Sequence, residues 1–295
     1  MFKYAVSNWI YGDEKLDDTY KRLNQAGYHG IELVGEPERY DPAEIIKLNS
    51  VYDVAVISVL SWCLWPPEDR DLAHINDGMR RKAVDYVCKN VDLAEAVGAS
   101  MVVVIPAPSG RPVPHRAPAE AGEWQLAARE EWNLAVDSVQ RIAHYAQNKN
   151  IIIAVEPINR FETFLLNSTA QGLQFIEEVG LPNVRLHLDT FHMNIEDADM
   201  SKAVEKAGPL LVNMHLSDSN RCAVGRGHIN FKALIEALVK IEYQGAFVLE
   251  PLPLHPNPFV AGKLPEFRSL WERDLAESIV ILRDLEQQVL KEKEV

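Results

Sequence analysis

Four acidic or imidazole side chains lie at the ends of short apolar segments in the second half of the chain. They are Glu156, Asp189, His215 and Glu250, and the segments before them are rich in Val, Ile and Leu. Such segments are typical of strands that are buried on both faces. If these strands are parallel neighbours, the four side chains converge at one end of one sheet. Three converging carboxylates repel each other and lose hydration. We therefore expect a divalent cation, because oxygen donors with one imidazole suit Mn²⁺, Mg²⁺ or a similar ion.

Three more polar residues follow these strand ends in the next loops: Glu162, His192 and Arg221. Each lies a few residues beyond one of the candidate ligands, so each could reach a molecule bound to the metal. Together they suggest groups that bind the hydroxyls of a polyol. The alternatives are solvated loop charges or a mutual salt bridge for Glu162 and Arg221, and capping or a supporting hydrogen bond for His192.

A cation beside two glutamates indicates a class of reaction. The cation would hold adjacent carbonyl and hydroxyl oxygens of a hydroxyketone and would polarise the ketone. One glutamate could then take the proton next to the carbonyl and give an enediolate. A second glutamate on the opposite face could return a proton there and invert the centre. Without such an acid, the enediolate would be reprotonated at the neighbouring carbon or would expel a leaving group.

Eight apolar segments alternate with longer amphipathic segments along the chain, without a block of strands alone or helices alone. This rhythm is typical of a (β/α)8 barrel, and we expect one such TIM-barrel domain over residues 1–295. A doubly wound open sheet is the competing fold, but no Gly-rich dinucleotide turn follows the first segment. The predicted strands are Lys3–Ser7, Gly30–Val34, Val54–Leu60, Ser100–Ile105, Ile151–Glu156, Val184–Asp189, Leu211–His215 and Gly245–Glu250. The predicted helices are Lys15–Ala26, Pro42–Tyr52, Met79–Val97, Glu123–Asn148, Thr169–Val179, Met200–Ala207, Phe231–Ile241 and Leu270–Leu290.

Three long loops follow predicted strands, so they lie on the face that carries the candidate ligands. They are Trp62–Gly78, Pro106–Gly122 and Pro251–Pro265. Loops of this length on that face usually shape a substrate pocket. Four tryptophans could line it, although ordinary packing is favoured for the last of them: Trp9, Trp62, Trp65 and Trp124.

Two further residues are expected to support the candidate ligands. His187 alternates with Asp189 along one strand, so it shares the inward face, where we favour a supporting or core role over direct ligation. Glu32 lies within the second predicted strand and could form a hydrogen bond with a ligand side chain or be a structural acid.

The overall composition excludes several classes of protein. A net charge of −13 over 295 residues would repel a phosphate backbone, so we expect no nucleic acid partner. The three cysteines, Cys63, Cys88 and Cys222, form no CxxC pair and suggest a reducing compartment. No segment resembles a secretion signal or a membrane span, so we expect a cytoplasmic protein with no membrane association.

The stretches EPINRFETFLLNSTAQG, VRLHLDTFHMNIED and HLSDSNRCAVGRGHINF resemble the xylose-isomerase-like barrel superfamily, and within it the ketose 3-epimerases. The resemblance implies that Glu156, Asp189, His215 and Glu250 bind one metal ion, and that Glu156 and Glu250 are the acid/base pair. It implies that Glu162, His192 and Arg221 hold the oxygens at the carbonyl end of a keto-sugar. It also implies Mn²⁺ first, with Co²⁺ or Mg²⁺ possible, and a homodimer or homotetramer.

Other parts of the chain resemble different relatives. The GRGHINF stretch and the Pro-rich loop after the fourth strand resemble proteins that act on 3-keto-glycosides, including the large subunit of C-glycoside deglycosidases, which would bring a small partner subunit. A barrel that only binds a sugar is a third alternative. DNA repair enzymes of the endonuclease-IV type need further histidines and an Asp-x-His triplet. This chain has Arg226-Gly227-His228 at the position of the triplet, so we do not expect a DNA repair enzyme.

Overall fold

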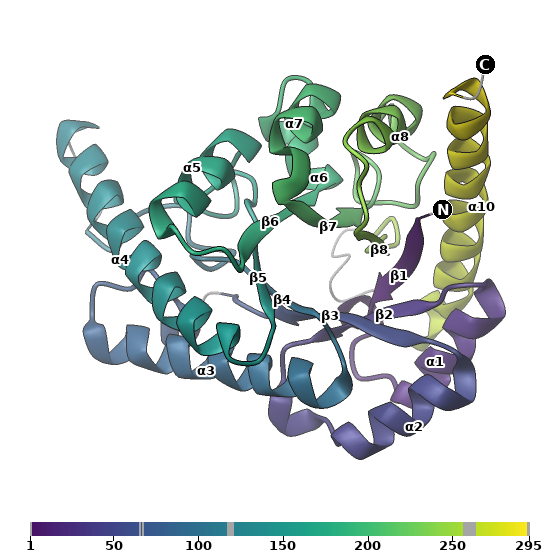
Figure 1. Cartoon of the computed structure of the whole chain (residues 1–295), viewed down its shortest axis with the longest axis horizontal. Helices are drawn as coiled ribbons and strands as arrows, with labels where there is room; N and C mark the ends of the chain where they lie inside the picture. The colour runs from purple at the N-terminus through teal and green to yellow at the C-terminus, as the bar shows by residue number, and fades with distance from the viewer. Residues whose placement is uncertain (1, 65, 67, 117–120, 256–263, 294–295) are drawn as a thin grey trace.

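The apolar segments form eight parallel strands that close into a barrel in chain order (Figure 1). The computed structural model describes residues 2–64, 66, 68–116, 121–255 and 264–293. Each strand pairs with the next one, and β8 pairs with β1 to close the ring, with Tyr4 opposite Phe247. The strands are β1 (Lys3–Ser7), β2 (Gly30–Val34), β3 (Ala55–Ser61), β4 (Met101–Val104), β5 (Ile152–Val155), β6 (Val184–Asp189), β7 (Leu211–Leu216) and β8 (Ala246–Leu249).

Helices between the strands form an outer layer around the barrel (Figure 1). The last helix runs beside β1, where the Tyr4 hydroxyl donates to Glu286 at 2.9 Å. The α-helices are α1 (Leu16–Ala26), α2 (Pro42–Tyr52), α3 (Asp77–Val97), α4 (Ala121–Gln147), α5 (Thr169–Val179), α6 (Thr190–Glu196), α7 (Met200–Ala207), α8 (Phe231–Lys240) and α10 (Arg268–Lys293). Short 3-10 helices are η1 (Asn8–Tyr11), η2 (Pro37–Arg39), η3 (Glu68–Arg70), η4 (Gly208–Leu210) and η5 (Pro265–Phe267).

Local sequence signals explain where several helices begin and end. Helix α5 begins with a capping box, in which the Ser168 side chain accepts from the Gln171 backbone and Gln171 reaches back to the cap. It ends at Gly180, whose φ of 70° is the left-handed conformation that glycine adopts without steric cost. Helix α3 begins at Asp77, and the preceding Asn76 caps it, because its side chain accepts from two backbone N–H groups.

The predicted barrel is confirmed, and every predicted strand and helix begins and ends within three residues of its observed bounds. Among the α-helices of the described residues, one was not predicted. The segment after Asp189 forms the short helix α6 because the Asp189 carboxylate accepts a hydrogen bond from Phe191 N at 2.8 Å and caps it. A helix of two turns shows too little periodicity to be recognised in a sequence.

The main hydrophobic core lies between the strands and the helices. Inside the barrel the apolar side chains form two smaller clusters, one around Leu60, Val103 and Ala154 and one around Ala5 and Val248. Ionisable side chains are also buried along β2, β6 and β7, among them Glu32, His187, Asp189 and His215. The barrel therefore combines apolar packing with buried ionisable groups.

No helix in the described ranges is long and apolar enough to cross a membrane. The three cysteines are free thiols, and Cys63 and Cys222 are buried.

Candidate active site

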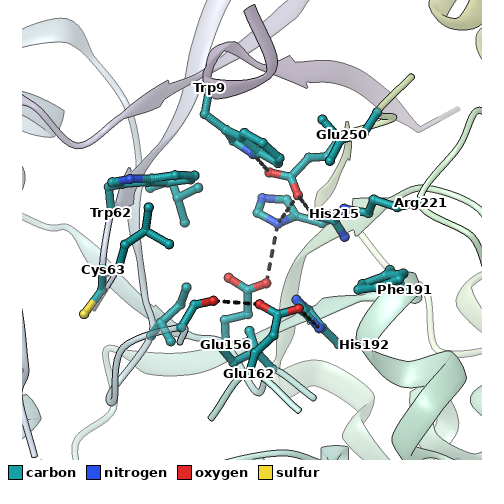
Figure 2. A pocket seen from close by; sticks show the side chains of 16 residues that line it. Trp9, Trp62, Cys63, Glu156, Glu162, Phe191, His192, His215, Arg221 and Glu250 are labelled. Carbon is teal, nitrogen blue, oxygen red and sulfur yellow. Dashed lines mark hydrogen bonds and ion pairs between the residues drawn. The ribbon is translucent and has the colours of Figure 1, made fainter. Parts of the chain in front are cut away.

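The four predicted metal ligands lie together at the ends of adjacent strands. Glu156 and Glu250 directly follow β5 and β8, whereas Asp189 and His215 lie within β6 and β7, and all four are buried. His215 Nδ1 lies 3.6 Å from Glu156 Oε1 and 3.2 Å from Glu250 Oε2. Figure 2 shows His215 between the two glutamates. Asp189 joins the group through Arg221, which donates to both Asp189 and Glu250.

The hydrogen bonds of His215 prepare it to bind a cation. Its Nε2 lies 2.9 Å from Glu32 Oε1, and the other oxygen of Glu32 accepts from Ser58 at 2.7 Å. When Nε2–H is donated to Glu32, the lone pair of Nδ1 faces the carboxylates. This arrangement of carboxylate and histidine is typical of metal sites. Within the described part of the chain, Nδ1 is buried and has no hydrogen-bond partner. These residues therefore fit a divalent cation, and Glu32 takes the supporting position that the sequence suggested.

Charged side chains of the protein balance each other within this site. Burial would lower the pKa of His215, but Glu250, Glu32 and Glu156 together raise it well above its ordinary value. Burial raises the pKa of Glu250 to about 7. For Asp189 the effect of burial is outweighed, first by Arg221, so its pKa is lowered. The site therefore holds protons that a cation would displace.

Glu162 and His192 lie side by side at the edge of the site (Figure 2). Asn159 connects them: its Nδ2 donates to Glu162 Oε1 at 2.9 Å and lies 2.8 Å from His192 Nδ1. The other oxygen of Glu162 accepts from the Ser109 hydroxyl at 2.8 Å. His192 Nε2 lies 3.6 Å from Asp189 Oδ2. Sequence reasoning did not single out Asn159, although it lies within the EPINRFE stretch.

Arg221 turns back from its loop toward the candidate ligands. Its φ of 62° is in the left-handed region, which is uncommon for a residue with a long side chain. Its guanidinium packs over the ring of Phe191 at 5.1 Å. Burial would lower its pKa, but the carboxylates of Asp189 and Glu250 raise it, so Arg221 is a fixed positive charge here.

His187 lies one layer deeper in the barrel. Its ring is edge-on to His215 with centroids 4.0 Å apart, and its Nε2 lies 3.9 Å from Glu156 Oε1. Among the described residues neither ring nitrogen has a hydrogen-bond partner. Burial lowers its pKa well below the ordinary value, so the ring is neutral.

A cavity of about 220 Å³ opens next to this group. Its polar lining consists of Glu156, Ser109, Glu162, His192, His215, Arg221 and Glu250. Apolar side chains form the rest of the wall, among them Trp9, Trp62, Ile158, Phe191 and Leu252. The first and second predicted loops contribute Trp62, Leu64 and Ser109, and the third contributes Leu252. Trp124 packs edge-on against Phe164 and not against this cavity. Trp65 and most of the third loop lie outside the described residues.

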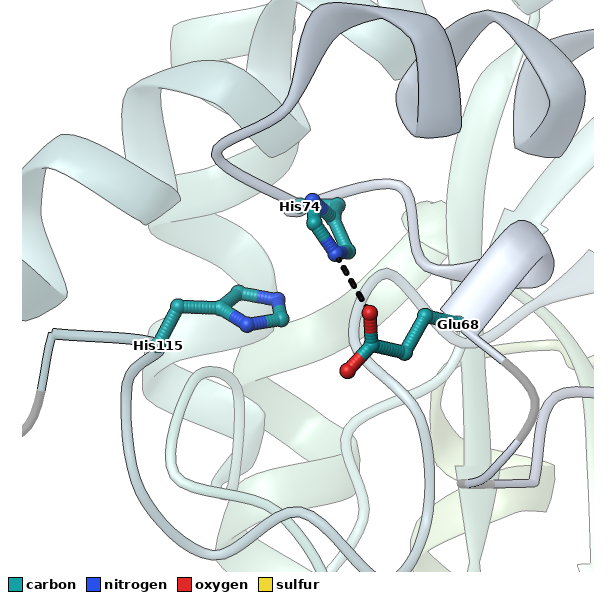
Figure 3. Close-up of side chains that lie close together, drawn as sticks. All are labelled: Glu68, His74 and His115. Carbon is teal, nitrogen blue, oxygen red and sulfur yellow. Dashed lines mark hydrogen bonds and ion pairs between the residues drawn. The ribbon is translucent and has the colours of Figure 1, made fainter.

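A second group of ionisable side chains joins two of these loops (Figure 3). Glu68 lies 3.0 Å from His74 Nε2, and the ring of His115 lies 4.0 Å from that of His74. The spacing would suit a metal ion. However, His74 Nδ1 accepts a hydrogen bond from Asn76 N at 2.9 Å, so the ring proton is on Nε2 and is donated to Glu68. The ring of His74 therefore links Glu68 to the backbone of Asn76 through two hydrogen bonds.

Comparisons with known proteins agree with the fold. The family model described as "Xylose isomerase-like TIM barrel" matches residues 20–268, so the chain belongs to this family. Over 146 residues the chain is 40% identical to an L-ribulose 3-epimerase of Methylomonas sp. (strain DH-1), a match that covers 49% of this chain and only 51% of that protein. It is 28% identical over 264 residues to an L-ribulose 3-epimerase of Mesorhizobium japonicum, with 89% and 84% of the two chains covered.

Two further relatives bear on substrate class. A solved structure of an L-ribulose 3-epimerase superposes with a TM-score of 0.85 at 26% identity, covering 100% of this chain and 97% of that one. A 3-dehydro-D-guloside 4-epimerase of Escherichia coli (strain K12) is 32% identical over 114 residues, which cover 39% of this chain and 44% of that protein. The relatives thus include epimerases named for a ketose and for a keto-glycoside.

Proposed function

We propose that this protein is a metal-dependent epimerase of a keto-sugar of the ketose 3-epimerase type. The observation that carries the proposal is the placement of two buried glutamates around one imidazole at the wall of the cavity. Glu156 comes from the end of β5 and Glu250 from the end of β8, and both line the cavity (Figure 2). Relatives named as L-ribulose 3-epimerases support it.

Each residue has a role in the proposed reaction. Glu156, Asp189, His215 and Glu250 would hold one divalent cation, Mn²⁺ first and Co²⁺ or Mg²⁺ as alternatives, and the cation would supply polarisation of the substrate carbonyl. One of Glu156 and Glu250 takes the proton from the carbon next to the carbonyl, and the other returns a proton on the opposite face.

The remaining polar residues of the cavity would orient the sugar. Glu162, His192 and Arg221 bind the oxygens at the carbonyl end. Asn159 keeps Glu162 and His192 in place, and the apolar wall excludes water from the intermediate.

Exchange of the substrate C–H with solvent tests this proposal. We expect the wild-type protein with Mn²⁺ to incorporate deuterium from D₂O into L-ribulose, D-fructose or D-tagatose, and E156Q and E250Q each to lose this exchange by at least about a hundredfold. Exchange that persists in both variants would remove the two glutamates as acid and base.

A second candidate is supported by the relative named for a 3-dehydro-guloside. In this case the same proton abstraction would act on a 3-keto-glycoside, either as an epimerase or as a lyase with a small partner subunit. A panel that sets free ketoses against a 3-keto-glucoside separates the two, since turnover of only the glycoside would favour the second candidate.

Three features of the whole protein remain predictions from the sequence. They are a single domain over residues 1–295, a homodimer or homotetramer, and a cytoplasmic location. Light scattering coupled to gel filtration tests the second.

A further inference from the structure

We propose that Trp9 is a positioning residue that fixes the carboxylate of Glu250 and leaves one of its oxygens to face the cation site. The inference rests on the proposed function and adds a residue from the opposite end of the chain. Trp9 lies in η1, directly after β1, and its indole Nε1 donates to Glu250 Oε1 at 2.5 Å (Figure 2).

The two oxygens of Glu250 have different surroundings. Oε1 receives the indole N–H, whereas Oε2 lies 3.2 Å from His215 Nδ1 and accepts from Arg221. A carboxylate held at one oxygen by a neutral donor keeps its other oxygen directed at the cation site. Trp9 thus selects which oxygen of Glu250 is available to a metal.

Glu156 is held less tightly than Glu250. Its Oε1 lies 3.6 Å from His215 Nδ1 and 3.9 Å from His187 Nε2, and both distances exceed a normal hydrogen bond. The acid/base pair therefore consists of one carboxylate that an indole fixes and one that is freer to reorient. Two donors cause this asymmetry: Trp9 holds Oε1 of Glu250, and Arg221 holds Oε2.

The side chains around Trp9 hold the orientation of its indole and exclude water from this hydrogen bond. The indole packs against Trp62 with ring centroids 5.4 Å apart, and the guanidinium of Arg221 lies 6.0 Å from its ring. Both indoles belong to the apolar wall of the cavity. A charge-assisted hydrogen bond gains strength where water is excluded. Its loss should resemble the removal of other groups that support a metal ligand, which reduces metal affinity or activity by about ten- to a hundredfold.

A pair of matched variants tests the inference. W9F removes the indole N–H and keeps an aromatic ring beside the cavity. W132F makes the same change at an indole that donates to Glu178 Oε2 at 2.7 Å and does not line the cavity. We expect W9F to bind Mn²⁺ about ten- to a hundredfold more weakly in a chelator competition assay and to have a lower kcat. W132F should retain both Mn²⁺ affinity and kcat within about twofold, because distant sites act independently.

A second variant and a set of contradicting results allow the role of Trp9 to be tested even if W9F does not fold. If thermal unfolding shows that W9F does not fold, 3-benzothienylalanine at position 9 preserves the bicyclic ring and replaces the N–H by sulfur. Equal Mn²⁺ affinity and equal kcat in W9F and W132F would overturn the role of Trp9 while leaving the proposed function intact. A wild-type protein that neither binds Mn²⁺ nor exchanges a keto-sugar C–H would overturn both.

Discussion

At the scale of single residues, the partner of each titratable group decides what that group can do. His215 could occupy either tautomer, and its contact with Glu32 selects the one that presents Nδ1 to the carboxylates. Glu32 is itself held by Ser58, so the orientation of the imidazole is fixed through two successive contacts. The sequence placed Glu32 in the second strand but could not distinguish this role from that of a structural acid.

Replacing Glu32 by Gln should weaken metal binding. The neutral amide removes the charge that favours Nε2–H on His215, so we expect Mn²⁺ affinity to fall about tenfold. Chelator competition measures this, with E38Q as a control, because Glu38 pairs with Lys89 at the exposed surface. Equal affinity in E32Q and wild type would contradict the role of Glu32.

Metal binding should depend on pH. Both His215, whose pKa is raised well above its ordinary value, and Glu250, whose pKa is raised to about 7, hold protons that compete with the cation. Raising the pH removes these protons, so apparent Mn²⁺ affinity should rise from pH 6 to pH 8, by about tenfold per pH unit for each proton released. Calorimetry in buffers of different ionisation enthalpy counts the released protons. Binding without proton release would show that these groups are already deprotonated.

At the scale of elements, a buried ionic network holds the loops after β3 and β4 against α4. Arg111 is buried between Asp71 and Glu131, at 2.8 Å and 2.7 Å. Asp71 also contacts His115 Nε2 at 3.0 Å. The two loops carry Trp62 and Ser109 into the cavity, so this network sets the position of its wall.

Replacing Arg111 by Met should strongly destabilise the protein. The change leaves two buried carboxylates without their shared cation, and breaking such a group typically costs about 3–5 kcal/mol. The matched control is R116M. Arg116 is exposed, and its ion pair with Glu130 is long, at 3.9 Å. Its loss should therefore change the free energy of unfolding by less than about 0.5 kcal/mol. Urea unfolding measures both. Similar stabilities of the two variants would show that the buried network is not needed.

Elements also show where sequence reasoning succeeded and where it stopped. Glu156, Asp189, His215 and Glu250 could be placed together because parallel strands of a barrel all end at one rim. Two contacts could not be predicted, because they depend on loop conformation and not on the periodicity of the sequence. Asp189 caps α6, and Asn159 links Glu162 to His192. The contact of Trp9 with Glu250 joins residues 241 positions apart, so it follows only from closure of the ring.

At the scale of the whole molecule, the cation should link the four C-terminal strands and so stabilise the fold. A ligand at a hundred times its Kd stabilises a protein by about 2.7 kcal/mol if it binds only the folded state. We therefore expect Mn²⁺ at this concentration to raise Tm by roughly 4 °C, as measured by differential scanning calorimetry. EDTA should reverse the rise, and D189N, which removes one predicted ligand charge, should reduce it. A Tm that Mn²⁺ leaves unchanged would contradict the predicted site.

The pairing of β1 with β8 has a consequence for synthesis of the protein on the ribosome. Residues 3 to 6 pair with residues 246 to 249, so this seam forms only after residue 249 has left the exit tunnel. At about 5–20 residues per second, the first strand waits on the order of 10–50 seconds for the last. Throughout that interval β1 has an open edge of the kind that promotes aggregation. Nascent chains that stall before β8 should therefore depend on chaperones.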